Sequence, residues 1–240
     1  DRILKNCESI LTDIDNKMSC QISTSEISKI NENAGIDYVQ VSDDTYYVIK
    51  ESINFSKMSN DTFDITIGPI IDLWAIGTDN AKVPIKDEII DKLSLVNYKN
   101  ILFNDDNKSI KLAKKNMKID LGGIAKGYAA DKIYKYLKEK NHHLKAYPLE
   151  PSSSPTLSTG THTGTHRIQG ISDEFVPPIV NLNDLNEIIS IDDGDAIIMA
   201  QKLSRELGLG VGISSGANFI GAVKALELNS ATSVAVTVFA

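Results

Sequence analysis

A change in composition near residue 145 constrains the fold of this 240-residue chain more than any other feature. Only Pro69 and Pro84, two of the seven prolines, precede residue 148, whereas "YPLEPSSSPTLSTGTHTGTH" (147–166) concentrates Pro, Ser, Thr and Gly. Such a stretch favours a loop or a linker over regular structure. The 42% apolar content is sufficient for buried cores. We therefore predict two regions, residues 1–144 and residues 145–240.

Charge and apolar patterning narrow the classes of function. A net charge of −7 and a pI near 5.1 argue against a nucleic-acid partner, which requires clustered Lys and Arg. No apolar run approaches the roughly 20 residues of a membrane helix, and "DRILKNCESI" lacks the order of a signal peptide. We expect a soluble protein with no transmembrane segment, and the cytoplasm is favoured. Because the sequence does not begin with Met, the possibility of a removed leader or lipid anchor stays open. The oligomeric state is not assigned.

The first region is predicted to be α+β. Helical spacing of apolar residues predicts helices over 1–16, 25–35 with Ser25 as N-cap, 44–59 and 83–98. The third of these is expected to face the core with Tyr47, Ile49, Ile53 and Phe55. "IDYVQVS" (36–42) alternates like a strand, "FDITIGPIIDLWAIG" (63–77) predicts extended chain and a turn at Gly68-Pro69, and residues 100–123 predict a hairpin turning at 104–107.

The second region is predicted to be α/β. "DDGDAIIMAQKLSREL" (192–207) indicates a helix capped by Asp192 or Asp193. "GLGVGISSGANFIGAVKALEL" (208–228) indicates a strand, a Ser-Gly turn and a second helix. The β-branched run "SVAVTVFA" (233–240) is typical of a buried parallel strand.

One segment carries a candidate site, "KIDLGGIAKGYAADKI" (118–133). A strand is predicted to end at Asp120, Gly122 and Gly123 make a tight turn, and a helix follows with Lys126 near its start. The glycines let a ligand approach the backbone, and the first N–H groups of a helix favour anions. The pattern predicts a site for a phosphate or a metal-bound phosphate. The simpler alternative is a helix start with a solvated lysine.

Cysteine and histidine do not predict a metal centre. Cys7 falls in line with the apolar residues of the first helix and is expected in the core. The four histidines, at positions 142, 143, 162 and 166, lie close together in sequence, but "HTGTH" is too rich in Gly and Thr to form a metal-binding helix face.

Several motifs of the first region occur together in the order found in one known family. They are "MSCQISTSEISKIN", "DTFDITIGPIIDLWAIGT", "VNYKNI" and "IDLGGIAKGYAADKI". Residues 1–143 resemble the N-terminal half of the FAD:protein FMN transferases, the ApbE family. The resemblance implies a transferase that uses Mg²⁺ and FAD to attach FMN to a Thr or Ser of a partner flavoprotein.

This resemblance also implies roles for individual residues. Asp120 and Lys126 would contact FAD, and Gly123 would bind the metal through its carbonyl oxygen. Flavin contacts would come from Thr62, Phe63 and Asp64. No residue is assigned as catalytic. The family's glycine-rich, His-containing and Asp-Ala-x-x-Thr segments, which complete its site, have no counterpart in this sequence.

The second region resembles a different family, through "KAYPLEPSSSPTLS", "HRIQGISDEFVPP", "DAIIMAQKLSRELGLGVGISSGAN" and "VTVF". Residues 145–240 are similar to the C-terminal portion of cysteine synthase, the O-acetylserine sulfhydrylase family of PLP enzymes, which implies a fragment of PLP fold type II. Ser214 would meet the pyridine nitrogen, and Gln169 and Gly170 would border the substrate cleft. The Schiff-base lysine of that family lies in a part that this sequence lacks.

The chain therefore has a chimera-like sequence, and three hypotheses follow. The first is an FMN transferase moiety that binds FAD and Mg²⁺, either active or inactive for want of the second half of its site. The second is a cysteine synthase-type enzyme that makes L-cysteine from O-acetylserine and sulfide with PLP, judged from the tail alone. The third is a catalytically silent fusion or interaction module.

Overall fold

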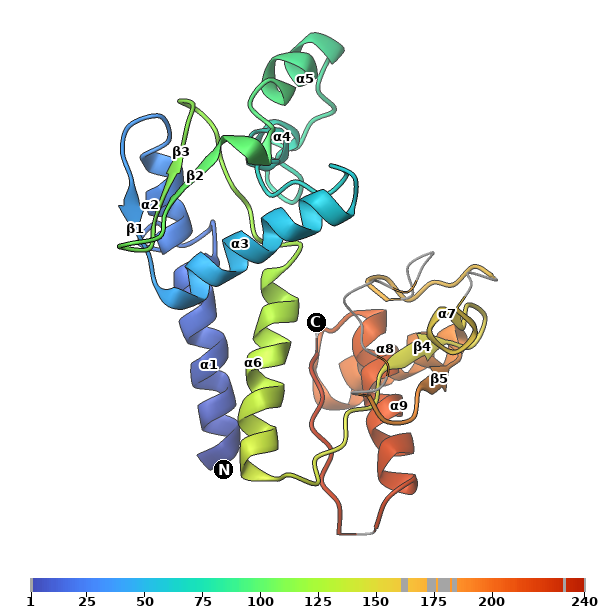
Figure 1. Cartoon of the computed structure of the whole chain (residues 1–240). Coiled ribbons are helices and arrows are strands. Elements are labelled where there is room, and N and C mark those ends of the chain that lie inside the picture. Colours follow the sequence, from blue (N-terminus) through green and yellow to red (C-terminus); the bar gives the residue numbers. More distant parts are fainter. Residues whose placement is uncertain are drawn as a thin grey trace. The chain divides into compact units, whose positions relative to one another are not determined.

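The computed structural model describes residues 2–160, 164–171, 176, 182, 185–230 and 232–239. By its internal contacts the chain divides into two compact units, residues 1–142 and residues 143–240 (Figure 1). Each unit has its own apolar core. His162 and most of "SDEFVPP" (172–178) lie outside the described residues. No helix in the described part is long and apolar enough to span a membrane.

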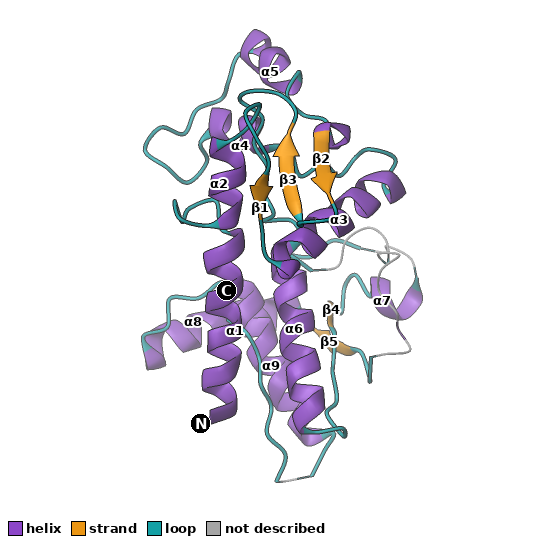
Figure 2. Cartoon of the chain, turned by 60° about the vertical axis from the view of Figure 1, so that its left-hand side comes forward, coloured by secondary structure: helices purple, strands orange, loops and turns teal. Residues whose placement is uncertain are grey.

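The first unit combines six α-helices with a small antiparallel sheet (Figure 2). Its strands β1 (Val39–Gln40), β2 (Ile101–Asn104) and β3 (Ser109–Leu112) are ordered β1-β3-β2, with Phe103 opposite Ile110. The other elements are α1 (Arg2–Met18), α2 (Glu26–Glu32), α3 (Asp43–Met58), α4 (Gly68–Trp74), α5 (Lys86–Leu93), the 3-10 helix η1 (Tyr98–Asn100) and α6 (Ala125–Lys140).

Local sequence explains most of these boundaries. The Ser25 hydroxyl accepts a hydrogen bond from the Ser28 N–H at 3.0 Å, so the predicted N-cap of α2 is confirmed. The predicted hairpin is also confirmed, because β2 and β3 pair on either side of residues 105–108. Cys7 is buried in α1, as expected.

Three expectations for the first unit are wrong. Residues 68–74 form helix α4 rather than extended chain, because Pro69 occupies the first turn, where its fixed φ suits a helix and its missing N–H costs nothing. On α3 the buried tyrosine is Tyr46, whereas Tyr47 is 54% exposed. The segment before Asp120 is not a strand, since its ladder consists of a single bridge between Ile67 and Lys118.

A charged cluster joins the three long helices of the first unit, of which α1 and α6 run side by side (Figures 1 and 2). Asp44 of α3 accepts hydrogen bonds from Lys17 at 2.9 Å, from Tyr128 at 2.5 Å and from Lys132 at 3.1 Å. Burial by itself would raise the pKa of Asp44, but these three hydrogen bonds outweigh it and lower the pKa to about 2.

The second unit is built on a parallel strand pair covered by helices. Strand β4 (Leu149–Pro151) runs parallel to β5 (Ile189–Ile191), and α7 (Thr156–Thr159), α8 (Asp193–Leu207) and α9 (Ile213–Glu227) complete the described elements. Asp192 caps α8 through the N–H groups of Gly194 and Asp195, as predicted. The chain is thus a two-part mixed helix and strand protein, with the expected parallel strands in its C-terminal part.

Two expectations for the second unit are wrong. Residues 208–212 form no strand, so Ser214 lies in the first turn of α9 rather than in a turn between a strand and a helix. Residues 233–239 are not a buried strand either, since Val234 is 86% exposed. An apolar β-branched run becomes a strand only where a neighbouring strand accepts its backbone hydrogen bonds, and the described sheet of this unit consists of β4 and β5.

Asp44 generates a prediction about acid stability. A carboxyl group with a lowered pKa in the folded state stabilises the fold above its unfolded pKa of 3.8, and this contribution is lost as the pH falls toward 2. We expect wild-type protein to lose more stability between pH 4 and pH 2 than Asp44→Asn. Urea unfolding followed by the fluorescence of Trp74, the single tryptophan, measures this in the first unit. Equal losses in the two proteins would contradict the prediction.

Gly216 generates a prediction about the second unit. A Cβ atom there would lie 2.0 Å from the Ala196 carbonyl oxygen and 2.8 Å from the Ala200 nitrogen, so α8 and α9 would have to separate. We expect Gly216→Ala to destabilise this unit by about 1–3 kcal/mol or more, seen as an earlier loss of helical circular dichroism with the Trp74 transition unchanged. Gly210→Ala is the control, because a Cβ atom at Gly210 meets nothing within 4 Å.

Candidate functional site

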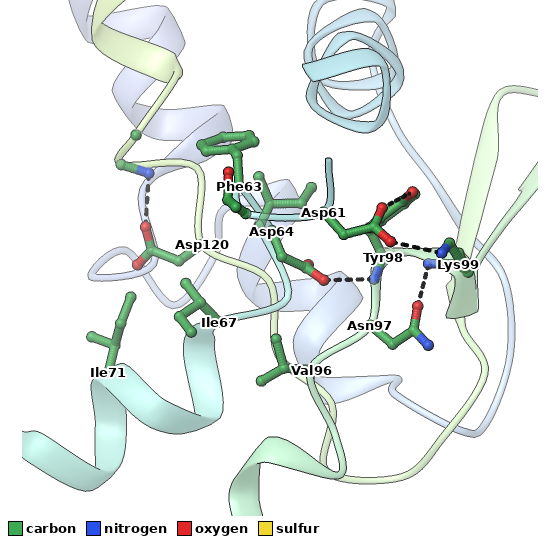
Figure 3. A pocket seen from close by; sticks show the side chains of 14 residues that line it. Asp61, Phe63, Asp64, Ile67, Ile71, Val96, Asn97, Tyr98, Lys99 and Asp120 are labelled. Atoms are coloured by element: carbon green, nitrogen blue, oxygen red, sulfur yellow. Dashed lines mark hydrogen bonds and ion pairs between the residues drawn. The ribbon is translucent and has the colours of Figure 1, made fainter. Parts of the chain in front are cut away.

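A cavity of about 720 Å³ in the first unit gathers residues from three separate segments (Figure 3). We call it the first cavity. The segments are the stretch before and within α4, the stretch leading into η1, and the glycine turn before α6. The lining residues are Asp61, Thr62, Phe63, Asp64, Ile65, Ile67, Ile71, Val96, Asn97, Tyr98, Lys99, Asp120, Gly122 and Gly123.

The glycine turn leaves its backbone open to the first cavity. The Asp120 carboxylate accepts a hydrogen bond from the Gly122 N–H at 2.7 Å, and a Cβ atom at Gly122 would lie 2.9 Å from that carboxylate oxygen. A Cβ atom at Gly123 would lie 3.1 Å from the Phe63 ring. The ring therefore lies against the turn, and side chains larger than hydrogen would fill the space between them.

The segment before the turn is held from both sides. The Asn31 side chain of α2 donates to the Ile119 carbonyl at 3.0 Å and accepts from the Ile119 N–H at 2.7 Å. On the other side, the Asp120 N–H donates to the Ile65 carbonyl at 2.8 Å and the Gly68 N–H donates to the Lys118 carbonyl at 3.2 Å. These bonds fix Asp120 beside the Phe63–Asp64 segment without a regular strand.

Asp64 uses its carboxylate to hold the wall of the first cavity together. One oxygen accepts from the Thr66 N–H at 2.7 Å and from the Thr66 hydroxyl at 2.6 Å, and the other accepts from the Tyr98 N–H at 2.9 Å. The Thr66 hydroxyl in turn accepts from the Asn97 N–H at 2.8 Å. Asp64 therefore acts on the shape of the cavity, because its oxygens already have three donors.

A second acidic side chain lies at the far wall. Figure 3 shows Asp61 turned toward Tyr98 and Lys99, away from Asp120. Its carboxylate accepts from the Tyr98 hydroxyl at 2.6 Å and from the Lys99 ammonium at 3.0 Å. These hydrogen bonds lower the pKa of Asp61 and raise the pKa values of Tyr98 and Lys99. Asn60 and Asp61 both have left-handed φ angles, 53° and 65°, which few residues besides Gly, Asn and Asp adopt.

The lining of the first cavity is acidic. Three carboxylates, of Asp61, Asp64 and Asp120, stand against the single ammonium group of Lys99. The negative charge of Asp120 also acts on the Cys20 thiol, which lies 3.4 Å from the Ile119 carbonyl oxygen. Burial, reinforced by Asp120, raises the pKa of the Cys20 thiol to about 12, so this thiol stays protonated.

The predicted site residues are placed as follows. Thr62, Phe63, Asp64, Asp120 and Gly123 all line the first cavity. Lys126 does not line it. It is exposed in the first turn of α6, a helix with no side-chain N-cap hydrogen bond, three residues beyond Gly123. Ser214 belongs to the second unit, where it is half-buried in the first turn of α9.

Sequence reasoning missed the far wall. Asp61, Tyr98 and Lys99 line the first cavity although the sequence assigned them no role. The signal was present, since Tyr98 and Lys99 lie inside "VNYKNI" (96–101), one of the motifs shared with the resembled family. No group of three or more His, Cys, Asp or Glu in the described part of the chain is arranged to hold a metal.

The first region of the chain is similar to proteins of one known family. The ApbE family model matches residues 2–148. The chain belongs to the ApbE family. It is 29% identical over 139 residues to the FAD:protein FMN transferase of Haemophilus influenzae, across 56% of this chain and 40% of the relative. It also resembles the crystal structure of the ApbE protein of Thermotoga maritima, with a TM-score of 0.56 and 34% identity over 59% of this chain and 46% of that one.

The C-terminal part has different relatives. There the chain is 40% identical over 104 residues to cysteine synthase B of Campylobacter jejuni, across 43% of this chain and 34% of the relative. Both resemblances are confirmed, so an ApbE-family part is followed by a cysteine synthase-like part. The chain spans less than half the length of each of these relatives.

The bonding of Asp64 predicts a structural cost for an isosteric change. In Asp64→Asn an amide NH₂ would face either the Thr66 donors or the Tyr98 N–H, leaving a donor without an acceptor. We expect the free energy of unfolding of the first unit to be about 1–3 kcal/mol lower in Asp64→Asn than in wild type, as measured through the fluorescence of Trp74. Asp61→Asn is the matched control, because Asp61 is exposed and its effect should be much smaller. An equal loss of stability in Asp64→Asn and Asp61→Asn would contradict the prediction that the hydrogen bonds of Asp64 stabilise the first unit more than those of Asp61.

Proposed function

We propose that the ApbE-family part, residues 1–144, carries one half of a flavin transferase site that binds FAD together with Mg²⁺. The observation that carries the proposal is the meeting of the Thr62–Asp64 segment and the Asp120–Gly123 turn in one cavity, although they lie far apart in the sequence. A cavity of about 720 Å³ has the size of a cofactor site.

The negative charge of the first cavity is the reason that the proposed binding of FAD includes a divalent cation. FAD carries a pyrophosphate, and an acidic lining repels it unless a cation lies between them. Oxygen ligands suit Mg²⁺, and the open glycine turn offers them in the Asp120 carboxylate and the Gly123 carbonyl. When bound, Mg²⁺ would neutralise charge on the pyrophosphate and on the leaving phosphate of AMP.

The remaining roles follow from where the side chains lie. Lys126 and the uncapped first turn of α6 together offer positive potential beyond the glycine turn, where a phosphate would be held. Phe63, half-buried against Gly123, offers an apolar ring to the flavin. Asp64 and Thr66 keep the far wall in place and so position the site rather than contact the reacting atoms.

The reaction proposed for a complete site is phosphoryl transfer. An acceptor Thr or Ser hydroxyl of a partner flavoprotein forms a bond to the FMN phosphorus, the bond to AMP breaks, and the hydroxyl proton leaves to a base. No described residue is assigned as that base. Because the chain spans under half of its ApbE relatives, FAD binding is the part of the function that this unit can carry by itself.

The cysteine synthase-like part, residues 145–240, supports a second candidate, PLP binding at Ser214. The 40% identity to a cysteine synthase favours it. Ser214 and the start of α9 could meet the cofactor ring, but the resemblance supplies no lysine for a covalent link, and such a link is needed for the usual chemistry. We expect borohydride treatment with PLP to trap no lysine adduct, and a trapped adduct would favour the cysteine synthase hypothesis.

FAD binding is tested by calorimetric unfolding of the full chain with FAD plus MgCl₂, with PLP as a comparison ligand. A ligand that binds only the folded state adds about 2.7 kcal/mol of stability at a hundredfold excess over its dissociation constant. We expect FAD with Mg²⁺ to raise the transition of the first unit, EDTA to reverse the rise, and Lys126→Ala to reduce it.

Lys135→Ala is the matched control, since Lys135 is exposed on the same helix α6 but far from the glycine turn. A shift that is equal in wild type and Lys126→Ala would remove Lys126 from the site. No shift with FAD and Mg²⁺, in a protein that unfolds cooperatively, would refute the proposed function and leave the silent interaction module as the favoured hypothesis.

A further inference from the structure

A second cavity, of about 770 Å³, lies in the first unit and shares no lining residue with the first. Helix α4 contributes to both, with Ile71 on the side of the first cavity and Pro69, Asp72 and Leu73 on the side of the second. The other lining residues of the second cavity are Asn31, Ala75, Asn80, Lys82, Lys92, Asn116, Met117 and Lys118.

The second cavity is basic where the first is acidic. Three lysines line it against one carboxylate, that of Asp72. Lys118 donates to both oxygens of Asp72 at 2.7 Å, and Lys82 donates to Glu88 at 2.8 Å. The shortest ion pair recorded for Lys92 among the described residues is 3.8 Å long, to Asp91. Such surface pairs are worth little, so a doubly charged anion competes with them for the lysines.

The second cavity also has an apolar floor and a fixed rim. Pro69 and Met117 are buried and Leu73 is half-buried, so an apolar group can be covered there. The rim includes Ala75 and Asn116, both with left-handed φ angles, of 46° and 67°. Ala75 lacks the side-chain hydrogen bonds that let Asn adopt this conformation, and its strained backbone ends α4 at the cavity.

We propose that the second cavity binds a small phosphate-bearing organic molecule. The phosphate would lie among Lys82, Lys92 and Lys118, and the apolar body would lie on Pro69, Leu73 and Met117. A cavity that is lined by apolar side chains and a few charged groups is the common form of a small-molecule site. This site needs no divalent cation, because the three ammonium groups can exchange their surface partners Asp72, Glu88 and Asp91 for the phosphate. It does not depend on the flavin transferase proposal.

Phenyl phosphate is the probe, because it joins a phosphate to an apolar ring, and phenol and inorganic phosphate test the two parts separately. In the full chain without Mg²⁺, we expect phenyl phosphate to shift the NMR amide signals of Ala75, Asn116 and Lys118, and to bind at least tenfold more tightly than phenol or phosphate alone. We expect Lys92→Gln to weaken the binding about tenfold or more. Benzoate tests whether a carboxylate serves as well, and equal or tighter binding of benzoate would overturn the choice of phosphate.

Two matched variants make the result specific. Lys86→Gln removes an exposed lysine of the same helix α5 that does not line the cavity, and Lys99→Gln removes the lysine of the first cavity. Both should bind phenyl phosphate as wild type does. Three results would overturn the proposal: no saturable shifts in the wild-type protein, shifts at the Phe63 and Gly123 amides in place of those named, or a loss in Lys86→Gln equal to that in Lys92→Gln.

Discussion

The two hydrogen bonds between the Asn31 side chain and the main chain of Ile119 hold the segment that both cavities of the first unit share. Lys118 lines the second cavity and Asp120 lines the first, with the fully buried Ile119 between them. The segment lacks the ladder of a strand, so its backbone groups need other partners. An amide that both donates and accepts satisfies two of them at once, and loss of it would leave the N–H and the carbonyl of Ile119 without these partners.

The sequence predicted those parts of the fold that depend on neighbours along the chain. Ser25 and Asp192 cap helices because a side-chain oxygen reaches N–H groups two or three residues ahead, and that distance is fixed by the backbone. Tyr46 and Tyr47 could not be distinguished in this way, because the choice of the buried tyrosine depends on packing, including the edge-on contact of Tyr46 with Phe103. The run 233–239 was mistaken for a buried strand because a strand exists only through the partner that it pairs with.

In the candidate site, too, the features that depend on neighbours along the chain were predicted, and those that depend on tertiary contacts were not. The glycine turn could be predicted from the sequence. Gly122 and Gly123 are needed there because the Asp120 side chain and the Phe63 ring come close to their backbone. What the sequence could not give was the use of Asp64, whose carboxylate serves the cavity wall through Thr66 and Tyr98. Motif residues are thus of two kinds, those that face a ligand and those that hold its walls, and only the hydrogen bonds of the fold separate them.

The two cavities, with opposite charge in their linings, lie on either side of one short helix. Helix α4 has seven residues, of which Ile71 lines the acidic cavity and Pro69, Asp72 and Leu73 line the basic one. The proposed function places a metal cation between an anion and the acidic cavity, whereas the second cavity has ammonium groups of its own chain in Lys82, Lys92 and Lys118. Under the two proposals, Mg²⁺ would decide where an anionic ligand binds: with Mg²⁺ it would bind at the glycine turn, and without Mg²⁺ it would bind at the lysines beyond α4.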